Sequence, residues 1–274
     1  MKFDVEKNII IDADVEKVRP LVEDFNNWNK WSPWTIIEPE CSVTVKGTAG
    51  EVGHTMSWDG EVIGAGTLTL EKKDDRGLYY DLQFIKPYKS LAKTSLFLDV
   101  AGGGTKVTWN MDSSMPFFMF FMVPIMKNWI GMDYERGLRM MKEIAEKGEV
   151  NAETINNGVV DLEGFSYVGI KRTVSVPEMP KIMHNDFERL MNDIVKTRNK
   201  GAKHWVTLYP KFDMKNMQAT YIAAVSDEEL KDVDLGPEYV RGTIASSKAF
   251  EIKHNGSYEF LGNAWSMGMM YTRA

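Results

Sequence analysis

The side chains that could move protons are few and scattered along this chain. His54 is the one histidine expected on the apolar face of a sheet, where a lone imidazole could act as a general base or be held in structural hydrogen bonds. Asp59, Glu61 and Asp81 fall on turns or on the opposite, polar face. They form no pair placed for general acid–base catalysis. The sequence therefore leaves the catalytic residues unassigned.

Residues that bind metals or phosphate groups are also poorly placed. His184, His204 and His254 are far apart and lack nearby acids or thiols at ligand spacing, and Cys41 is the single cysteine. The glycines at 102–104 join two predicted strands and do not open a helix, so they indicate a hairpin turn and not a phosphate-binding loop. We expect no metal ion and no cofactor.

Charge and hydropathy exclude further classes of function. The formal net charge is −6 and the sequence pI is about 5.4, so clustered basic residues are not available and no nucleic acid is expected as a partner. The most apolar stretch, at 115–126, has about a dozen residues, whereas a membrane-spanning helix needs about 20. Met1 and Lys2 lead directly into a strand pattern without a signal peptide, and a single cysteine suits a reducing compartment. We expect a cytoplasmic protein without a membrane span.

Three tryptophans, Trp28, Trp31 and Trp34, stand within seven residues at the end of the first predicted helix. Indole rings are costly to expose and fit poorly into tight gaps. The cluster is interpreted either as a packing anchor or as the rim of an apolar cavity. Eight of the 18 methionines lie between Met111 and Met141, and flexible thioethers suit both an irregular core and a surface that accepts varied apolar ligands.

The spacing of apolar residues predicts the elements that position these side chains. Residues 3–11 alternate as a strand, and helical spacing follows from Val15 to Phe25. From Cys41 to about Met111 the period is two, interrupted by glycine-rich and aspartate-rich turns, which predicts an antiparallel meander of about six strands. One face of this sheet carries His54, Met56, Trp58, Leu82, Phe84, Leu96, Leu98, Trp109 and Met111.

A long helix is predicted after Pro124 and continues to about Glu146. Its apolar face, which includes Trp129, is wide and needs a sheet to cover it, so the sheet should wrap around this helix and can enclose a cavity. Arg136 lies on the same apolar stripe as Trp129. It either extends to solvent along its aliphatic stem or needs a buried carboxylate partner.

The remaining sequence predicts a second unit. Residues 148–162 are polar and helix-breaking and are expected to form a linker between domains at 1–147 and 163–274. In the second domain we expect a strand at 165–176, a helix from Met179 to near Gly201, and strands at 205–209, 218–225 and 248–253. A final helix should place one apolar face inward, made of Leu261, Ala264, Trp265, Gly268 and Met269.

Six short motifs occur in order within residues 3–147. They are IDAD (11–14), DFNNWNKWSPW (24–34), SWDG (57–60), GAG (64–66), KVTW (106–109) and GMDYERGL (131–138). In this order they resemble the polyketide-cyclase branch of the START-like (SRPBCC) superfamily. The resemblance implies a helix-grip fold with a deep apolar cavity between the sheet and the long helix. Members include lipid carriers, cyclases, aromatic-ring enzymes and chaperone co-factors, so the fold does not settle the function.

Residues 163–272 carry GIKRTVSVPEM (169–179), WVTLYP (205–210) and KHNGSYEFL (253–261). These segments resemble the GyrI-like effector-binding domain, whose two strand-helix-strand-strand halves enclose an aromatic-lined pocket. The sequence departs from that pattern because two closing strands would lie beyond Ala274. Either the chain is truncated or the second pocket is incomplete, and the missing strands would leave a short exposed sheet edge.

The predicted fold class is α+β, with a helix-grip (START-like) antiparallel sheet wrapped on a long C-terminal helix, followed by a second α+β GyrI-like domain. The expected function is binding of small hydrophobic or aromatic molecules in an apolar cavity. One alternative is a cyclase, dehydrase or hydrolase in which His54 or a tyrosine transfers protons, and another is a module that binds a partner protein such as a chaperone or gyrase. The expected ligand-binding residues are Trp31, Trp34, His54, Met56, Trp58, Phe84, Leu98, Trp109, Met111, Trp129, Trp205, Tyr209, Tyr221, Tyr258 and Trp265.

Overall fold

The chain forms two compact units in the computed structural model, which describes residues 1–198, 204–226 and 236–272. The first unit comprises Met1–Gly158 and Phe250–Ala274, and the second comprises Val159–Ala249. The chain leaves the first unit within strand β8 (Ala152–Leu162) and returns within β13 (Ser247–Gly256). The last helix, expected in the second domain, is therefore grouped with the first unit.

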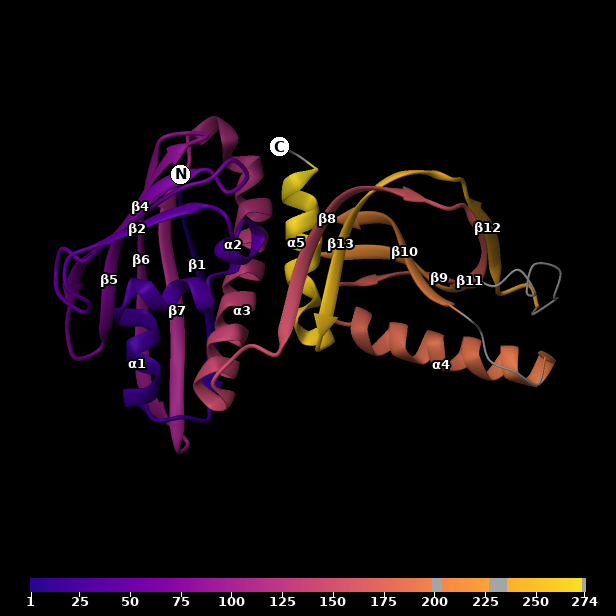
Figure 1. The fold of residues 1–274 in the computed structure, drawn as a ribbon, viewed down its shortest axis with the longest axis horizontal. Coiled ribbons are helices and arrows are strands. Elements are labelled where there is room, and N and C mark those ends of the chain that lie inside the picture. The colour runs from indigo at the N-terminus through magenta and orange to yellow at the C-terminus, as the bar shows by residue number, and fades with distance from the viewer. Residues whose placement is uncertain (199–203, 227–235, 273–274) are drawn as a thin grey trace. The chain divides into compact units, whose positions relative to one another are not determined.

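The first unit is built on one large antiparallel sheet (Figure 1). Its seven strands lie in the order β1-β7-β6-β5-β4-β3-β2. The predicted meander supplies all of them except β1, which returns to pair with β7. The strands are β1 (Lys2–Ile11), β2 (Ser42–Lys46), β3 (Thr55–Asp59), β4 (Ala65–Lys73), β5 (Gly77–Lys86), β6 (Ser90–Ala101) and β7 (Gly104–Ser114).

A long helix lies along this sheet, as the sequence predicted. Helix α3 (Val123–Lys147) contacts β1 and ends at Gly148, whose φ of 95° is left-handed and favours glycine. Short elements fill the connections before it: α1 (Val15–Glu23), η1 (Phe25–Lys30), α2 (Pro33–Ile37) and η2 (Phe117–Met122). The large sheet and the long helix are consistent with the helix-grip fold.

Strand register determines which side chains face the helix. Trp109 pairs with Leu96, and Met111 pairs with Thr94, which in turn pairs with Tyr80. All five side chains are buried, whereas their neighbours along the strands alternate toward the opposite face. The core of the first unit therefore lies on this helix-facing side, on the face that the period-two pattern predicted.

The C-terminal helix presents a different face from the one expected. Helix α5 (Leu261–Tyr271), which follows η4 (Tyr258–Phe260), contacts α2 and buries Asn263, Ala264 and Met267. Trp265, expected on the inner side, is 48% exposed. The physical reason is a polar contact, because the Arg136 guanidinium of α3 donates to the amide oxygen of Asn263 at 2.8 Å.

The second unit contains a four-stranded antiparallel sheet in the order β10-β11-β9-β12. Helix α4 (Met179–Arg198) contacts β9 and β11. The strands are β9 (Phe165–Ser175), β10 (His204–Asp213), β11 (Gln218–Ser226) and β12 (Val240–Ile244). The sequence pattern did not predict β12, and the end of the helix expected near Gly201 lies outside the described residues.

Most of the expected linker forms a strand. β8 pairs with β13 in a two-stranded sheet, and Asn157 donates its side-chain N–H to Glu251, 94 residues away in the sequence. The sequence of β8 is polar and gives no local strand signal, and the strand that pairs with it lies about 90 residues further along the chain. None of the helices in the described part of the chain is long and apolar enough to cross a membrane.

Candidate functional site

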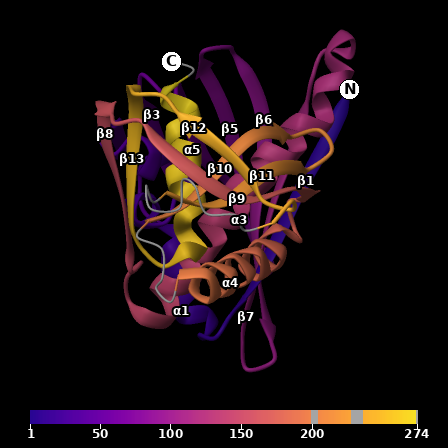
Figure 2. The ribbon, with the colours of Figure 1, turned by 90° about the vertical axis from the view of Figure 1, so that its right-hand side faces the viewer.

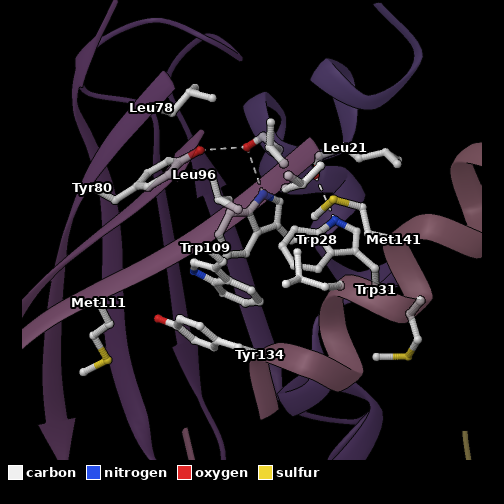
Figure 3. Packing of buried hydrophobic residues seen from close by; sticks show 14 of the residues in the cluster. Leu21, Trp28, Trp31, Leu78, Tyr80, Leu96, Trp109, Met111, Tyr134 and Met141 are labelled. Carbon is white, nitrogen blue, oxygen red and sulfur yellow. Dashed lines mark hydrogen bonds between the residues drawn. The ribbon is translucent and has the colours of Figure 1, made fainter. Parts of the chain in front are cut away.

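A closed group of aromatic side chains fills the middle of the helix-facing side of the first-unit sheet (Figure 3). Trp109 of β7 stacks on Tyr134 of α3, with ring centroids 3.9 Å apart and an angle of 8° between the ring planes. Trp31 meets Trp109 edge to face at 5.3 Å, and Trp28 lies 4.6 Å from Trp31. Edge-to-face and stacked pairs are the arrangements that aromatic rings prefer. Trp31, which the sequence assigned either to a packing anchor or to the rim of a cavity, has no exposed surface.

The polar atoms of this aromatic core are bonded to the backbone. The indole N–H of Trp28 and the hydroxyl of Tyr80 both donate to the carbonyl oxygen of Val22, each at 3.0 Å. The indole N–H of Trp31 donates to the carbonyl of Leu21 at 2.8 Å. Because buried polar groups are costly when unpaired, these bonds fix the tryptophan cluster against α1. The cluster therefore acts as a packing anchor.

The hydroxyl of Thr94 connects the indole N–H of Trp109 with the hydroxyl of Tyr134. Its hydroxyl donates to the carbonyl of Asn110 at 2.6 Å and accepts the indole N–H of Trp109 at 3.0 Å, while the hydroxyl of Tyr134 lies 3.3 Å away. Burial raises the pKa of the Tyr134 phenol above its ordinary value. Tyr134 therefore keeps its proton at neutral pH.

His54, the histidine considered as a base, is 2% exposed and has both ring nitrogens engaged. The backbone N–H of Phe25 donates to Nε2 at 3.2 Å, and Nδ1 lies 3.1 Å from the carbonyl oxygen of Lys46. A carbonyl only accepts, so Nδ1 carries the hydrogen and the ring is in one defined tautomer. The ring also stacks on Phe25. His54 therefore has no nitrogen available for a substrate proton in this arrangement.

One end of the same helix-facing side is less closed. We call it the open end, and define it by the half-buried side chains of Trp58, Leu82, Phe84 and Met115, all packed against the core. Trp58 of β3 meets Phe84 of β5 edge to face at 6.3 Å. Gly66 of β4 lies between these strands, and a Cβ there would stand 2.4 Å from the Trp58 ring. Glycine at position 66 thus lets the indole lie across the strand.

The other predicted residues of the first unit surround the core or lie near its edge. Met56, Leu98 and Met111 are buried in the core, and Trp34 and Trp129 are half-buried. The indole N–H of Trp34 donates to Asp133 at 3.2 Å, and Asp133 also pairs with Arg136. Arg136 is 9% exposed and does not extend to solvent, because Asp133 is the carboxylate partner that a buried guanidinium requires.

A hollow of about 580 Å³ lies at one end of the first-unit sheet. Consecutive triplets from β1, β5, β6 and β7 line it, and they include Leu82 of the open end. None of the predicted ligand-binding residues is part of it. Its lining is Lys2, Phe3, Asp4, Asp81, Leu82, Gln83, Leu91, Ala92, Lys93, Asp112, Ser113 and Ser114.

In the second unit, three predicted aromatic residues come from neighbouring strands. Trp205 and Tyr209 are on β10 and Tyr221 is on β11. Trp205 is 40% exposed and meets Phe187 of α4 edge to face at 5.6 Å, whereas Tyr221 is fully buried and its hydroxyl donates to Asp186 at 2.7 Å. Asp186 also accepts the guanidinium of Arg172.

The other two residues of the predicted second pocket, Tyr258 and Trp265, belong to the first unit. Tyr258 is 84% exposed. Among the described residues, no group of three or more His, Cys, Asp or Glu side chains is arranged to hold a metal ion.

Sequence comparison places the chain in a family. The family model for polyketide cyclase / dehydrase and lipid transport matches residues 2–146, which span the seven-stranded sheet and nearly all of α3. The chain belongs to this family. The match includes the aromatic core and the open end. The description of the family includes lipid transport, which suggests hydrophobic ligands. No curated protein matches the chain significantly.

Solved structures that match this chain cover about half of it. The solution structure of the Aha1 dimer from Colwellia psychrerythraea is 18% identical, with a TM-score of 0.41, and covers 54% of this chain and 99% of that one. A protein from Nitrosospira multiformis is 20% identical, with a TM-score of 0.40, and covers 53% and 98%. A protein from Chromobacterium violaceum is 14% identical, with a TM-score of 0.40, and covers 52% and 96%.

Two features of this region were not found by reasoning from the sequence. Thr94 was not singled out, because a threonine in a strand gives no signal that three partners will meet at its hydroxyl. The apolar run that contains the phenylalanines of η2 indicates only that it is too short to span a membrane, and all four rings are exposed. Their position directly before the long helix was the available signal.

Proposed function

We propose that the first unit binds a small apolar or aromatic molecule at the open end, between the sheet and the N-terminal half of α3. The observation that carries this proposal is the half-buried pair of Trp58 and Phe84 on the helix-facing side. A ligand that covers these rings removes apolar surface from water, which is the main driving force for binding in sites of this kind. Membership in a family described by lipid transport supports the same class of ligand.

The aromatic core beyond the open end limits the depth of such a site. Trp109, Tyr134 and Trp31 occupy the middle of the helix-facing side and contact one another. A ligand would therefore rest against this packed floor and not pass through it. This favours a molecule that is held partly at the end of the sheet, with the rings of Trp58 and Phe84 against its apolar part.

The test is a binding measurement with purified full-length protein. We expect native mass spectrometry and thermal shift with a panel of fatty acids and flat polycyclic aromatics to identify a ligand. Trp58→Ala should weaken its binding about tenfold, equivalent to about 1.4 kcal/mol.

The matched control uses a second edge-to-face pair on the opposite face of the same sheet. Tyr79 and Phe97 lie 5.7 Å apart there. Phe97→Ala should leave ligand binding unchanged. Equal affinity in wild type and Trp58→Ala, or no thermal shift with any compound of the panel, would reject the proposal.

For the second unit we propose a separate ligand-binding surface at Trp205 and Phe187, in line with the GyrI-like resemblance. The support is the partly exposed indole of Trp205 against Phe187 of α4, with Tyr209 on the same strand. Aromatic faces of this kind accept flat or cationic organic molecules. Trp205→Ala should abolish quenching of protein fluorescence by a flat cationic dye, while Tyr258→Ala should not, because Tyr258 belongs to the first unit.

A further inference from the structure

The short helix η2 exposes a group of apolar side chains that ligand binding at the open end does not use. Its six residues are FFMFFM, and none of them is buried. Phe117, Phe118, Phe120 and Phe121 are 80%, 75%, 55% and 59% exposed. Phe120 pairs with Phe117 and Phe121 at about 6 Å, and none of the four phenylalanines belongs to the hydrophobic core or packs against it. Contiguous exposed apolar side chains mark interaction sites.

Other exposed apolar side chains lie at the same end of the sheet. Ser90 of β6 pairs with Phe84, and Ala92 pairs with Ser113, so the hairpin tip between β5 and β6 extends past the end of β7, where η2 begins. Tyr88 at this tip is 83% exposed. The amino group of Met1 donates to the carbonyl of Met115, and Figure 2 shows the N-terminus next to the start of α3. We call Met1, Tyr88 and the four phenylalanines the apolar tip.

Basic side chains accompany the apolar tip. Lys2 and Lys89 are exposed and directly follow Met1 and Tyr88. Within the ranges that the structure describes, neither lysine forms an ion pair. Lys127, in the first turns of α3, is partly exposed and lies 3.5 Å from Asp4. Lysines at the edge of an apolar patch can contact anionic lipid headgroups, and tyrosine favours the interface between water and lipid.

From this combination we infer that the first unit docks on a phospholipid membrane through the apolar tip, with the phenylalanines inserted among the acyl chains. No charged residue occurs between Ser114 and Lys127, so nothing in η2 opposes insertion. The rings project from one short 3-10 helix and one hairpin tip. A bilayer interface accepts such rings without a complementary groove, whereas a protein partner would have to provide one. The contact is peripheral, because η2 is far too short to span.

Membrane docking also defines the source of the ligand. The open end and the apolar tip share one end of the sheet, since Phe84 precedes the hairpin that carries Tyr88, and Met115 precedes η2. An apolar molecule could pass between the bilayer and the open end without crossing water. This part of the inference rests on the proposed function, while docking itself does not.

The test is flotation of the full-length protein with vesicles made of equal parts of phosphatidylcholine and phosphatidylglycerol. Wild type should float with the vesicles. The double variant Phe117→Ser and Phe118→Ser should lose at least about tenfold in vesicle affinity. The matched control, Ile10→Ser with Val100→Ser, removes two exposed apolar side chains elsewhere on the unit and should float like wild type.

A second variant tests the role of charge. Lys2→Glu with Lys89→Glu should weaken binding to the mixed vesicles about tenfold but leave binding to pure phosphatidylcholine vesicles unchanged, and added salt should reduce the difference. Loss on both kinds of vesicle would contradict a headgroup contact by these lysines.

The outcomes separate docking from ligand binding and from self-association. If Phe117→Ser with Phe118→Ser keeps the thermal shift by a soluble ligand but loses flotation, docking is supported. If Trp58→Ala loses the thermal shift but still floats, the two sites are distinct as inferred. Wild type that fails to float, or that elutes as a dimer converted to monomer by the η2 variant without vesicle binding, would overturn the inference.

Discussion

Two groups of aromatic side chains lie on the same helix-facing side of the first-unit sheet, and their packing differs. In the aromatic core, the polar atoms of Trp28, Trp31 and Trp109 are hydrogen-bonded, and each ring contacts several others. At the open end, Trp58 and Phe84 are half-buried and meet each other edge to face. Beyond it, the rings of η2 are mostly exposed. Burial thus decreases from the middle of the sheet toward one end.

The difference shows that residue type does not separate a core from a binding surface. Trp109 and Trp58 are both tryptophans on inward-facing positions of strands, and both belong to motifs of the same family pattern. Trp109 is covered because Tyr134 of α3 stacks on it and Thr94 accepts its N–H. The partner that the structure gives to the Trp58 ring is Phe84. Coverage by α3 makes the distinction, and it can be tested by substitution.

The largest expected effect is on the folding free energy of Trp109→Ala. Removing a fully buried indole should lower the free energy of unfolding by about 3–5 kcal/mol, because a cavity replaces the ring. Trp58→Ala should lower it by only about 1–2 kcal/mol, because that ring is half-exposed. Urea unfolding of both variants makes the comparison, and equal losses would mean that the two rings are packed alike.

A smaller decrease in the free energy of unfolding is expected for Thr94→Val. The valine has a similar shape but leaves the N–H of Trp109 and the hydroxyl of Tyr134 without this partner, which should cost about 1–3 kcal/mol. Thr55→Val, on the opposite face of the sheet, is the matched control and should cost less. A neutral Thr94→Val would show that the core does not depend on its polar junction.

High pH should weaken the aromatic core. Burial raises the pKa of both Tyr80 and Tyr134 in the folded protein. The unfolded chain loses these protons near pH 10 while the folded protein keeps them, so the stability is fully present below about pH 10 and falls as pH rises above it. Each tyrosine should contribute a slope of about 1.4 kcal/mol per pH unit.

Urea unfolding across this alkaline range measures the slope. Tyr134→Phe should remove one tyrosine's share, and the double variant with Tyr80→Phe should remove both. An unchanged slope in the double variant would contradict the assignment to these two phenols.

The smallest expected effect on stability is at η2. Because Phe117 is exposed, Phe117→Ser should change the free energy of unfolding by no more than about 0.5 kcal/mol. Thermal unfolding would check this directly. A large loss would place the ring in the core and remove the basis for the apolar tip.

Much of the first unit could be predicted because its signals are local. The alternation between Cys41 and Met111 fixed six strands and the face shared by Met56, Trp109 and Met111, and the helical period after Pro124 fixed α3. The second half was predicted less well. The sequence predicts a linker where β8 forms, and it predicts the wrong buried face for α5. The strand and the orientation of the helix both depend on contacts with residues far away in the sequence.

The candidate site divides in the same way. The sequence could nominate Trp31, Trp58 and Phe84 together, since all are aromatic residues at inward positions. It could not rank them by exposure, because exposure depends on which strand positions α3 covers. It favoured a structural role for His54 but could not identify the partners, because these are backbone atoms of Phe25 and Lys46.

The sequence by itself determined the α+β class of the first unit, the succession of its strands and long helix along the chain, and the face of the sheet that is apolar. Those properties follow from periodicity, which every local segment carries. Only the tertiary structure decided that Trp28 and Trp31 are sealed in the core, that Arg136 is buried beside Asp133, and that η2 is exposed. Each of these depends on where a helix lies against a sheet, and side-chain packing over long sequence distances sets that position.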